Sequence, residues 1–458
     1  MKTPRKPGRI LLTATLVTGL AASLAACGSG GGSTSAQPTA ALASGSAMNA
    51  WTAATKKSLG GTTITVAAAT HPATTAMQKL ATEFTAQTGI NVKFDVTEEN
   101  SLQNKEKLDY QSNAGRYDVD MADSFWMAEY ASLGILAPLD SILKDPAKTP
   151  SFYDHQDMHP AYSSTDLIKG TTYGVPLAGE TRIVGYRKDL FEKYGKQPPK
   201  TMDDMLSLAK FFNGKDGVYG IAMRGQRGIH FASGLLTVMY QFSDGFFNPK
   251  TGANQIAAPE NVRALQYYVD LLKNAPPDVS SYTHEEALSA FTAGKAAMWF
   301  DATSLVPDIL DPSKSAVADK VGFVGPPSGP RGTYGALAGW HIGVAAHSKH
   351  QDAAWAFIMW LTSKPNAPAF VSQGGTATRN SMVDTPTNDV QKAYYPAMGE
   401  GLKAAANLID QGISWIPAVP QSLAKLVVIG NHGSDALVGK APAQQALQAA
   451  QTEVAGIK

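Results

Sequence analysis

The sequence predicts an α/β protein of two domains. From Thr62 onward, apolar runs of strand length alternate with helical segments, and the chain continues to Lys458. A repeated strand and helix series favours a parallel sheet with right-handed crossovers. A body of this length exceeds one ordinary domain and fits two domains of about 200 residues each.

The first strand is predicted at TTITVAAAT (62–70), an apolar run. The helix after it ends at Gly89, a natural C-cap, and four of its apolar residues share one face: Ala76, Met77, Leu80 and Phe84. NVKFDV (91–96) alternates apolar and polar residues, which predicts the second strand.

The same pattern continues through a helical stretch near 102–110, the strand YDVDMAD (117–123) and a helix closed by Gly134. Ligands of parallel sheets bind beyond the carboxyl ends of the strands. The loops at His71 and at 123–126 are therefore candidate binding loops.

Later segments keep the α/β pattern. The chain is extended up to Tyr186 and then helical, and an apolar helix is predicted at QDAAWAFIMWLTS (351–363). YGALAGWHIGVAA (334–346) is a glycine-rich extended run. Four stretches between them are helical in period or composition: TMDDMLSLAKFF, GLLTVMYQF, NVRALQYYVDLLK and HEEALSAFTAGKAAMWF. The two long extended segments are candidates for passages between the domains.

Residues 1–26 have the layout of a secretory signal peptide, with four basic residues ahead of an apolar stretch from Ile10 to Leu24. That stretch is short for a membrane-spanning helix. Leu24-Ala25-Ala26-Cys27 resembles the lipobox of bacterial lipoproteins, in which the cysteine is alkylated by a diacylglyceryl group and becomes the new N-terminus. The chain holds one cysteine, so an intramolecular disulfide is excluded. The alternative is an ordinary signal peptide with a chance cysteine near its cleavage site.

The segment 27–60 is predicted to be the lipidated Cys27 followed by a flexible linker with a reach of roughly 30 Å, since it lacks an apolar period. Two acyl chains satisfy the requirement for stable membrane anchoring. Removal of the signal peptide takes four of 39 basic residues and leaves all 38 acidic ones. The mature chain is slightly acidic and has no basic run, so we expect no nucleic-acid partner.

Motifs for catalysis on cofactors or metals are missing from the sequence. There is no phosphate-binding loop, dinucleotide fingerprint, H-E-x-x-H, G-x-S-x-G or C-x-x-C, so we expect no cofactor. His155 and His159 are four residues apart, but Pro160 follows and the stretch is typical of a loop. These two histidines are expected to be solvated surface residues, as are His347 and His350, and no metal site is predicted.

Three carboxylates, Asp123, Glu180 and Asp301, interrupt otherwise apolar or small-residue stretches. Two paired carboxylates can cleave a glycosidic bond. Carboxylates can equally accept hydrogen bonds from sugar hydroxyls, and the residues alone do not separate the two functions.

Five segments in order resemble the extracellular solute-binding proteins of bacterial ATP-driven importers, the type that includes maltodextrin-binding protein. The first is the lipobox at 24–27. The other four span most of 62–380, and they are YDVDMADSFWMAEYASLGILAPLD, YGVPLAGETRIVGYRKDLFEKYG, ALSAFTAGKAAMWFDAT and GWHIGVAAHSKHQDAAWAFIMWLTS. The resemblance implies a two-lobed, type II periplasmic-binding-protein-like fold, in which each lobe has a central sheet flanked by helices. The ligand then lies between the lobes, which close on it.

The same resemblance implies the lobe boundaries. The N-terminal lobe is expected to comprise 61–178 and about 333–385. The C-terminal lobe is expected to comprise 179–332 and about 386–458.

The resemblance places Glu180 on the first crossing strand, where the family's acid faces the cleft and accepts sugar hydroxyls. Arg182 lies on the same face by the period of two and is expected to bind ligand or to keep Glu180 ionised. Ser124-Phe125-Trp126 stands where maltodextrin-binding protein has an acid–arginine pair, which argues against a malto-oligosaccharide ligand.

Tryptophans complete the expected sugar site, because a pyranose stacks its C–H face on an aromatic ring. The candidates are Trp126, Trp299 and Trp340, with Trp415 a weaker one, whereas Trp355 and Trp360 are expected in the core. The remaining predicted ligand-binding residues are His71, Asp123, Ser124, Asp301, Arg224, Arg227 and Arg379. Arg224 and Arg227 lie in a glycine-rich loop before a helix expected to begin near Ile229.

The predicted function is that of a lipid-anchored, monomeric receptor outside the cytoplasm, which captures a sugar or polyol and delivers it to a membrane permease. It is not predicted to be an enzyme, and ATP is hydrolysed by separate subunits. One alternative is a surface glycoside hydrolase that uses two of Asp123, Glu180 and Asp301. Another is a receptor of the same fold for a peptide or a metal chelate.

Overall fold

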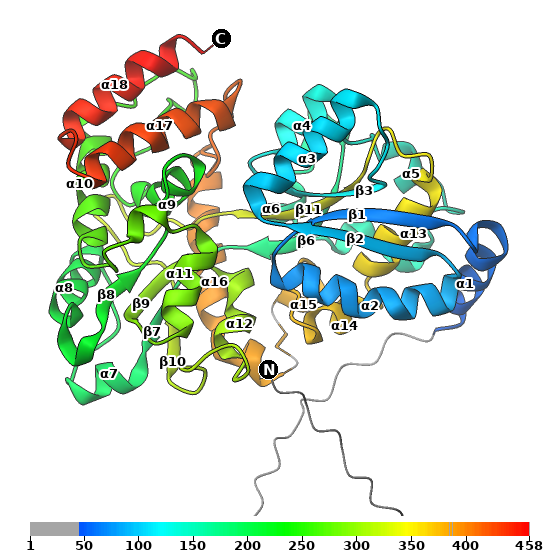
Figure 1. Cartoon of the computed structure of the whole chain (residues 1–458), viewed down its shortest axis with the longest axis horizontal. Coiled ribbons are helices and arrows are strands. Elements are labelled where there is room, and N and C mark those ends of the chain that lie inside the picture. The colour runs from blue at the N-terminus through cyan, green and yellow to red at the C-terminus, as the bar shows by residue number, and fades with distance from the viewer. Residues whose placement is uncertain (1–44, 384, 387, 458) are drawn as a thin grey trace, which may run out of the picture. The chain divides into compact units, whose positions relative to one another are not determined.

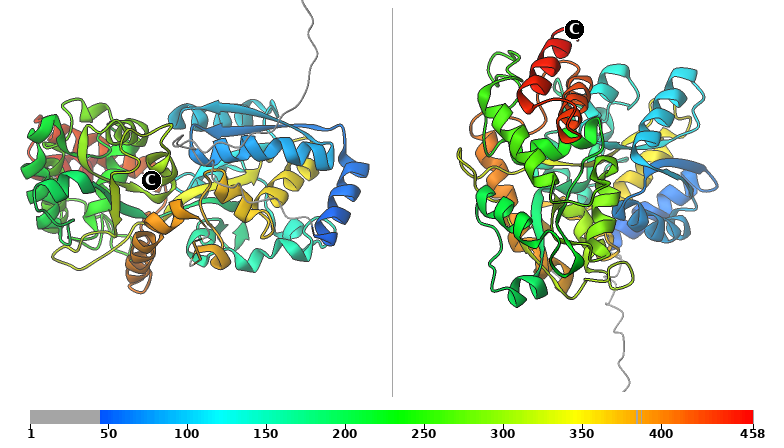
Figure 2. Two further views of the ribbon diagram at one scale, coloured as in Figure 1. Left: turned by 90° about the horizontal axis from the view of Figure 1, so that it is seen from below. Right: turned by 60° about the vertical axis from the view of Figure 1, so that its left-hand side comes forward.

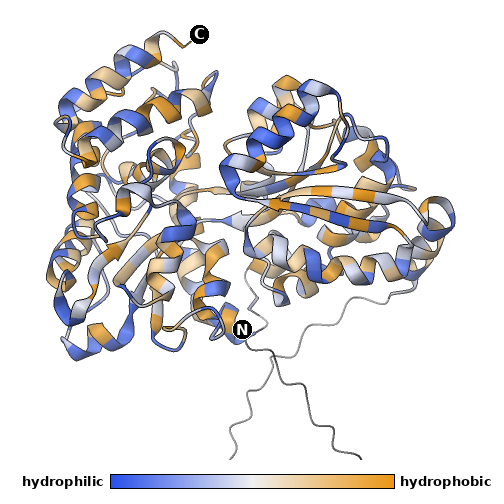
Figure 3. Ribbon diagram, in the orientation of Figure 1, coloured by the Kyte–Doolittle hydropathy of each residue, from blue (hydrophilic) through white to orange (hydrophobic). Residues whose placement is uncertain are grey.

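The structure is a computed structural model that describes residues 45–383, 385–386 and 388–457. These residues form two lobes, each with a central sheet covered by helices (Figure 1). Figure 3 shows that many helices have one apolar and one polar side, whereas the central strands are mostly apolar. The α/β fold class predicted from the sequence is confirmed.

The N-terminal lobe has a five-stranded sheet in the order β2-β1-β3-β11-β6. The strands are β1 Thr63–Ala69, β2 Asn91–Thr97, β3 Val119–Asp123, β6 Val175–Glu180 and β11 Ala338–Val344, with a small ribbon of β4 Leu167–Ile168 and β5 Thr171–Thr172. Its helices are α1 Ser46–Leu59, α2 Pro72–Thr88, α3 Glu99–Ser112, α4 Met127–Leu133, α5 Asp140–Lys144, α6 Pro160–Ser163, α13 Gln351–Thr362, α14 Ala367–Ser372 and α15 Asn380–Val383. Strands β1, β2 and β3 are parallel, as predicted, and β11 is antiparallel to β3 and β6.

The C-terminal lobe has a four-stranded sheet in the order β10-β7-β9-β8. Its strands are β7 Arg182–Arg187, β8 Tyr219–Ala222, β9 Ala296–Ala302 and β10 Val321–Val324. Its helices are α7 Lys188–Lys193, α8 Met202–Phe212, α9 Ile229–Met239, α10 Pro259–Leu272, α11 His284–Thr292, α12 Val306–Leu310, α16 Asp389–Ile409, α17 Ser422–Leu437 and α18 Ala443–Ala455.

Local sequence explains how the first binding loop is formed. Helix α2 follows β1 directly, with Pro72 at its first position and the His71 side chain capping it. It ends at Gly89, which has the left-handed φ of 70° that favours glycine. The loop thus holds His71 at the carboxyl end of a buried strand.

The chain passes between the lobes at places where a strand or helix of one lobe leads into the other. Strand β6 belongs to the N-terminal sheet and β7 to the C-terminal sheet, so Thr181 is the turning point. The second passage runs from β10 to β11, and the third from α15 to α16. Glu180 and Arg182 therefore flank the first passage.

Helix α1 corrects the prediction that residues up to 60 form a flexible linker. Its buried residues Met48, Thr52 and Thr55 are spaced four and three apart, so they share one face. Trp51 also contacts Phe152 edge to face, with ring centroids 6.3 Å apart. Threonines fill two of the buried positions, which hid the helical period. Figure 2 shows α1 at the end of the N-terminal lobe that is remote from the C-terminal lobe.

Cys27 and the signal peptide lie outside the described residues. Within the described part of the chain, no helix combines the length and apolar character needed to cross a membrane.

Candidate ligand-binding site between the lobes

Two cavities are lined by residues of both lobes. The first, of about 350 Å³, lies between Asn100, Gln103 and Trp126 on one side and Arg227, Gly228, Ile229, Leu423, Val427 and Asn431 on the other. The second, of about 360 Å³, brings Thr70, His71, Pro72 and Thr75 opposite His284, Glu285, Leu288, Ser289, Thr292, Leu305, Asp308 and Lys314. A group of buried polar and aromatic side chains connects the two cavities.

Glu180 lies at the centre of this group, with 4% of its surface exposed. Its Oε1 accepts a hydrogen bond from the Ser304 hydroxyl of the other lobe and is 3.6 Å from Nε2 of His71. The His71 Nδ1 accepts from the backbone N–H of Ala73 at 3.1 Å, so Nε2 carries the ring proton and faces the carboxylate. The cap of α2 therefore sets the tautomer that supports Glu180.

The surroundings keep Glu180 ionised. Burial by itself raises the pKa of this carboxyl, but the His71 hydrogen bond, the Arg182 charge and the Ser304 hydroxyl together lower it to about 2. At neutral pH Glu180 is a buried acceptor that carries a full negative charge.

Arg182 and Arg224 meet at Asp301. Arg224 donates from Nε and Nη2 to the two oxygens of Asp301, each at 2.8 Å, and Arg182 also pairs with Asp301 through Nη1. Burial, followed by the charge of Arg224, lowers the pKa of Arg182 to about 9. The Arg182 Nε has no hydrogen-bond partner among the described residues. These contacts bring three predicted site residues together.

Asp123 has its pKa shifted in the opposite direction from that of Glu180. Its Oδ1 accepts from the backbone N–H of Phe125 at 2.8 Å. Burial and then the neighbouring Glu99 charge raise its pKa well above the ordinary value. Two carboxyls whose pKa values are shifted in opposite directions would also suit an acid–base pair, so geometry alone does not separate binding from hydrolysis.

Aromatic rings line the same region. Trp340 packs edge to face on Trp126, with centroids 5.5 Å apart, and tilts against His71 at 5.6 Å. Trp415 packs on Phe125 at 5.5 Å, beneath the Arg182 guanidinium, and its buried Nε1 has no acceptor among the described residues. Trp415, the weaker candidate from the sequence, thus lies about as close to Arg182 as Trp340 lies to His71.

Ser124 is buried at this site, but its hydroxyl is engaged within the protein. It donates to the carbonyl of Gly339 at 2.7 Å and lies 3.0 Å from Nε2 of His341. Ser124 therefore fastens the loop after β3 to β11, and we assign it a positioning role.

Two predicted ligand-binding residues, Trp299 and Arg379, make the contacts described here within a single lobe. Trp299 is fully buried and stacks on Phe291 with centroids 6.2 Å apart, and the absent side chain of Gly185 on the next strand leaves room for its ring. Arg379 is fully buried and donates to the backbone carbonyls of Tyr153, Asp154 and Thr362. Both side chains stabilise their own lobe.

Arg227 lines the first cavity but is half exposed. Its Nη1 forms an ion pair with Asp435 of α17 at 2.6 Å. The residue therefore ties the glycine-rich loop to the C-terminal helices, and its guanidinium is only partly available to a solute.

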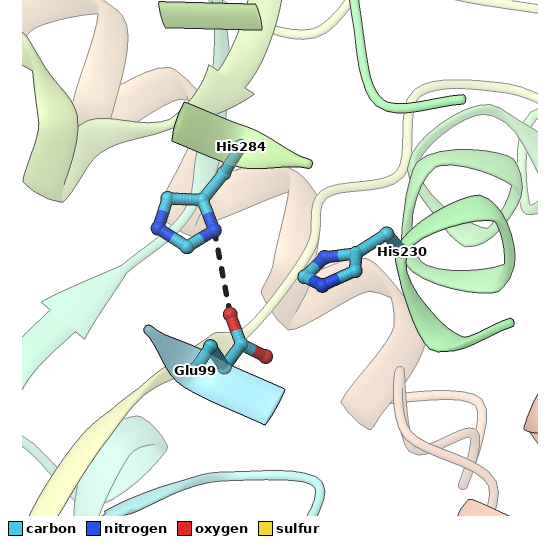
Figure 4. A group of neighbouring side chains, drawn as sticks. All are labelled: Glu99, His230 and His284. Atoms are coloured by element: carbon cyan, nitrogen blue, oxygen red, sulfur yellow. Dashed lines mark ion pairs between the residues drawn. The ribbon is translucent and has the colours of Figure 1, made fainter. Parts of the chain in front are cut away.

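The sequence did not indicate three buried residues that meet between the lobes: Glu99, His230 and His284 (Figure 4). The charges of His230 and His284 outweigh burial and lower the pKa of Glu99 to about 2. Burial is the main reason that the pKa of His230 falls to about 4. Each residue lies at or next to the first residue of a helix, and these helices are far apart in the sequence.

Comparison with known proteins establishes the family. The model of the family described as bacterial extracellular solute-binding protein matches residues 68–368. The chain belongs to the bacterial extracellular solute-binding proteins. The mannitol-binding protein of Pseudomonas aeruginosa is 30% identical to this solute-binding protein over 415 residues, which cover 86% of this chain and 93% of that protein.

Solved structures agree with the two-lobed architecture. A solute-binding protein of Agrobacterium radiobacter K84 in complex with ribitol aligns with a TM-score of 0.79 and 28% identity, over 87% of this chain and 100% of that one. Another, from Agrobacterium vitis S4 with bound D-mannitol, aligns with a TM-score of 0.76 and 32% identity, over 86% and 98%. The predicted two-lobed type II binding-protein fold is confirmed.

Proposed function

We propose that this solute-binding protein captures a carbohydrate of the polyol class between its lobes and delivers it to the permease of an ATP-driven importer. The observation that carries the proposal is the buried set of donors and acceptors at the first passage between the lobes. An ionised carboxylate, Glu180, and two donors without acceptors among the described residues, on Arg182 and Trp415, gather there. A chain of hydroxyl groups offers both donors and acceptors to such a set.

The named ligands of the relatives support the polyol class. The relatives described above bind or hold mannitol and ribitol, which are acyclic polyols. A hydroxyl donating to a buried carboxylate contributes about 1.5–3 kcal/mol. Two or three such bonds, with contact to the tryptophans, suffice for an affinity near the micromolar range, about −8 kcal/mol.

Closure of the lobes is the proposed working motion. Glu180 lies on the N-terminal sheet and accepts from Ser304 of the C-terminal lobe, so the two lobes meet at this residue. A solute that touches both lobes only in the closed form shifts the population toward it by that difference in binding free energy. The permease then distinguishes loaded from empty receptor.

We further propose that Cys27 is lipidated and holds the receptor at the outer face of the cell membrane. The support is the lipobox-like Leu24-Ala25-Ala26-Cys27 alone, which lies outside the described residues. A receptor tethered beside its permease has a high effective concentration there.

A thermal-shift screen tests the solute class. The chelator-treated protein is heated with mannitol, ribitol, glucose, maltose, amino acids and chelated iron in turn, because a solute that binds only the native state raises the melting temperature. We expect stabilisation by polyols. Stabilisation by an amino acid or by chelated iron alone would contradict the proposal.

Hydrolysis is the alternative that the two unlike carboxyls favour. We expect no turnover when the pure protein is incubated with a panel of aryl glycosides. Turnover that Glu180→Gln abolishes would establish a hydrolase and refute the receptor role.

A further inference from the structure

Glu99, His230 and His284 bring one oxygen and two nitrogen atoms within 4.8 Å of one another. Glu99 begins α3 in the N-terminal lobe, whereas His230 and His284 lie at the starts of α9 and α11 in the C-terminal lobe. All three side chains are buried, with at most 7% of any residue exposed. Figure 4 shows the two imidazole rings turned toward the carboxylate.

The spacing of these atoms fits a tetrahedral ion. Bonds of about 2.0–2.1 Å place the ligands of a tetrahedral zinc ion about 3.3 Å apart. Oε2 of Glu99 and Nδ1 of His284 are 3.3 Å apart, so this edge already has the required length. The His230 nitrogen lies within 4.8 Å of both of these atoms.

The donor types select the class of ion. Imidazole nitrogen suits zinc and the neighbouring first-row transition metals, whereas magnesium and calcium prefer oxygen. Two histidines and one glutamate leave a fourth position for water or a solute hydroxyl. Asn100 also lies at this point, with its Nδ2 3.4 Å from Nε2 of His230.

We propose that Glu99, His230 and His284 form a binding site for one divalent transition-metal ion of the zinc class, which links the two lobes. These residues differ from the histidine pair that the sequence offered as possible metal ligands, His155 and His159. The site is independent of which solute the receptor captures. Because one ligand comes from one lobe and two from the other, the ion favours the closed arrangement.

Zinc titration of the full mature chain, free of any affinity tag and treated with chelator, tests the site. We expect one zinc ion per chain, and the double variant His230→Gln/His284→Gln to bind it at least about a hundredfold more weakly. His432→Gln is the matched control, since His432 pairs with Glu453 at 2.8 Å on the surface of α17 and α18. Zinc binding by the control variant should equal that of the unmodified protein.

A cobalt spectrum of the unmodified protein adds a measurement that needs no variant to fold. Tetrahedral coordination by nitrogen and oxygen gives Co²⁺ a strong visible absorption, which zinc should displace. Absence of stoichiometric zinc binding and of this absorption, or zinc binding that survives the double variant unchanged, would overturn the proposal. Polyol binding is measured separately with chelator present, so either the metal site or the solute class can fail alone.

Discussion

Replacing Glu180 by glutamine tests the site at its most informative residue, because the substitution removes the charge and nearly keeps the shape. Despite burial, contacts with His71, Arg182 and Ser304 hold the pKa of Glu180 at about 2, against an ordinary value of 4.5. That difference corresponds to about 3 kcal/mol of preference for the ionised carboxylate. Glutamine forfeits this preference and leaves the Arg182 charge less well balanced.

The solute should bind more weakly to Glu180→Gln by about 10- to 150-fold, which is the loss of one charge-assisted hydrogen bond of about 1.5–3 kcal/mol. Isothermal titration calorimetry with the polyol that stabilises the protein best measures this ratio. Glu192→Gln, an exposed change on α7, is the matched control and should bind normally. If Glu180→Gln binds the solute with an affinity within twofold of that of the unmodified protein, Glu180 does not bind the solute.

Four further outcomes are expected. Since the folded state lowers the pKa of Glu180, the ionised carboxylate stabilises the fold fully above pH 4.5, the unfolded value, and this stabilisation is lost as the pH falls toward 2. The unfolding free energies of the unmodified protein and of Glu180→Gln should therefore converge near pH 2. A constant difference between the two free energies at every pH would contradict this. Trp415→Phe should weaken solute binding by about 3- to 10-fold because one buried donor is removed, whereas the core change Trp360→Phe should leave calorimetric affinity intact; equal effects would count against the Trp415 role. Trp299→Ala should cost about 3–5 kcal/mol of stability in denaturant titrations. Unchanged stability with weaker solute binding would instead place Trp299 in the binding site. Cys27→Ser should move the protein from the membrane pellet to the soluble fraction, and retention in the pellet would refute lipidation.

The sequence predicted those parts of the site that break a local pattern. Glu180 and Arg182 are charged residues within an apolar stretch, and the resemblance to solute-binding proteins placed that stretch at the crossing between the lobes. His71 and Asp123 follow the carboxyl ends of β1 and β3, where ligands of such sheets bind. These positions follow from strand periodicity and chain order.

Other parts depend on contacts that no local pattern reveals. Trp299 and Asp301 are two apart on β9, yet Trp299 meets Phe291 in the core whereas Asp301 meets two arginines at the strand end. Glu99, His230 and His284 come from helices separated by many residues, and only the approach of the two lobes brings them together. Helix α1 was missed because threonines, Thr52 and Thr55, fill two of its three buried positions.

Calorimetric titration of the chelator-treated protein with mannitol and with ribitol tests the central claim most directly. The account predicts saturable binding of at least one of them, with one molecule per chain and a dissociation constant near the micromolar range. Failure of both to bind, together with saturable binding of an amino acid or of chelated iron, would contradict it.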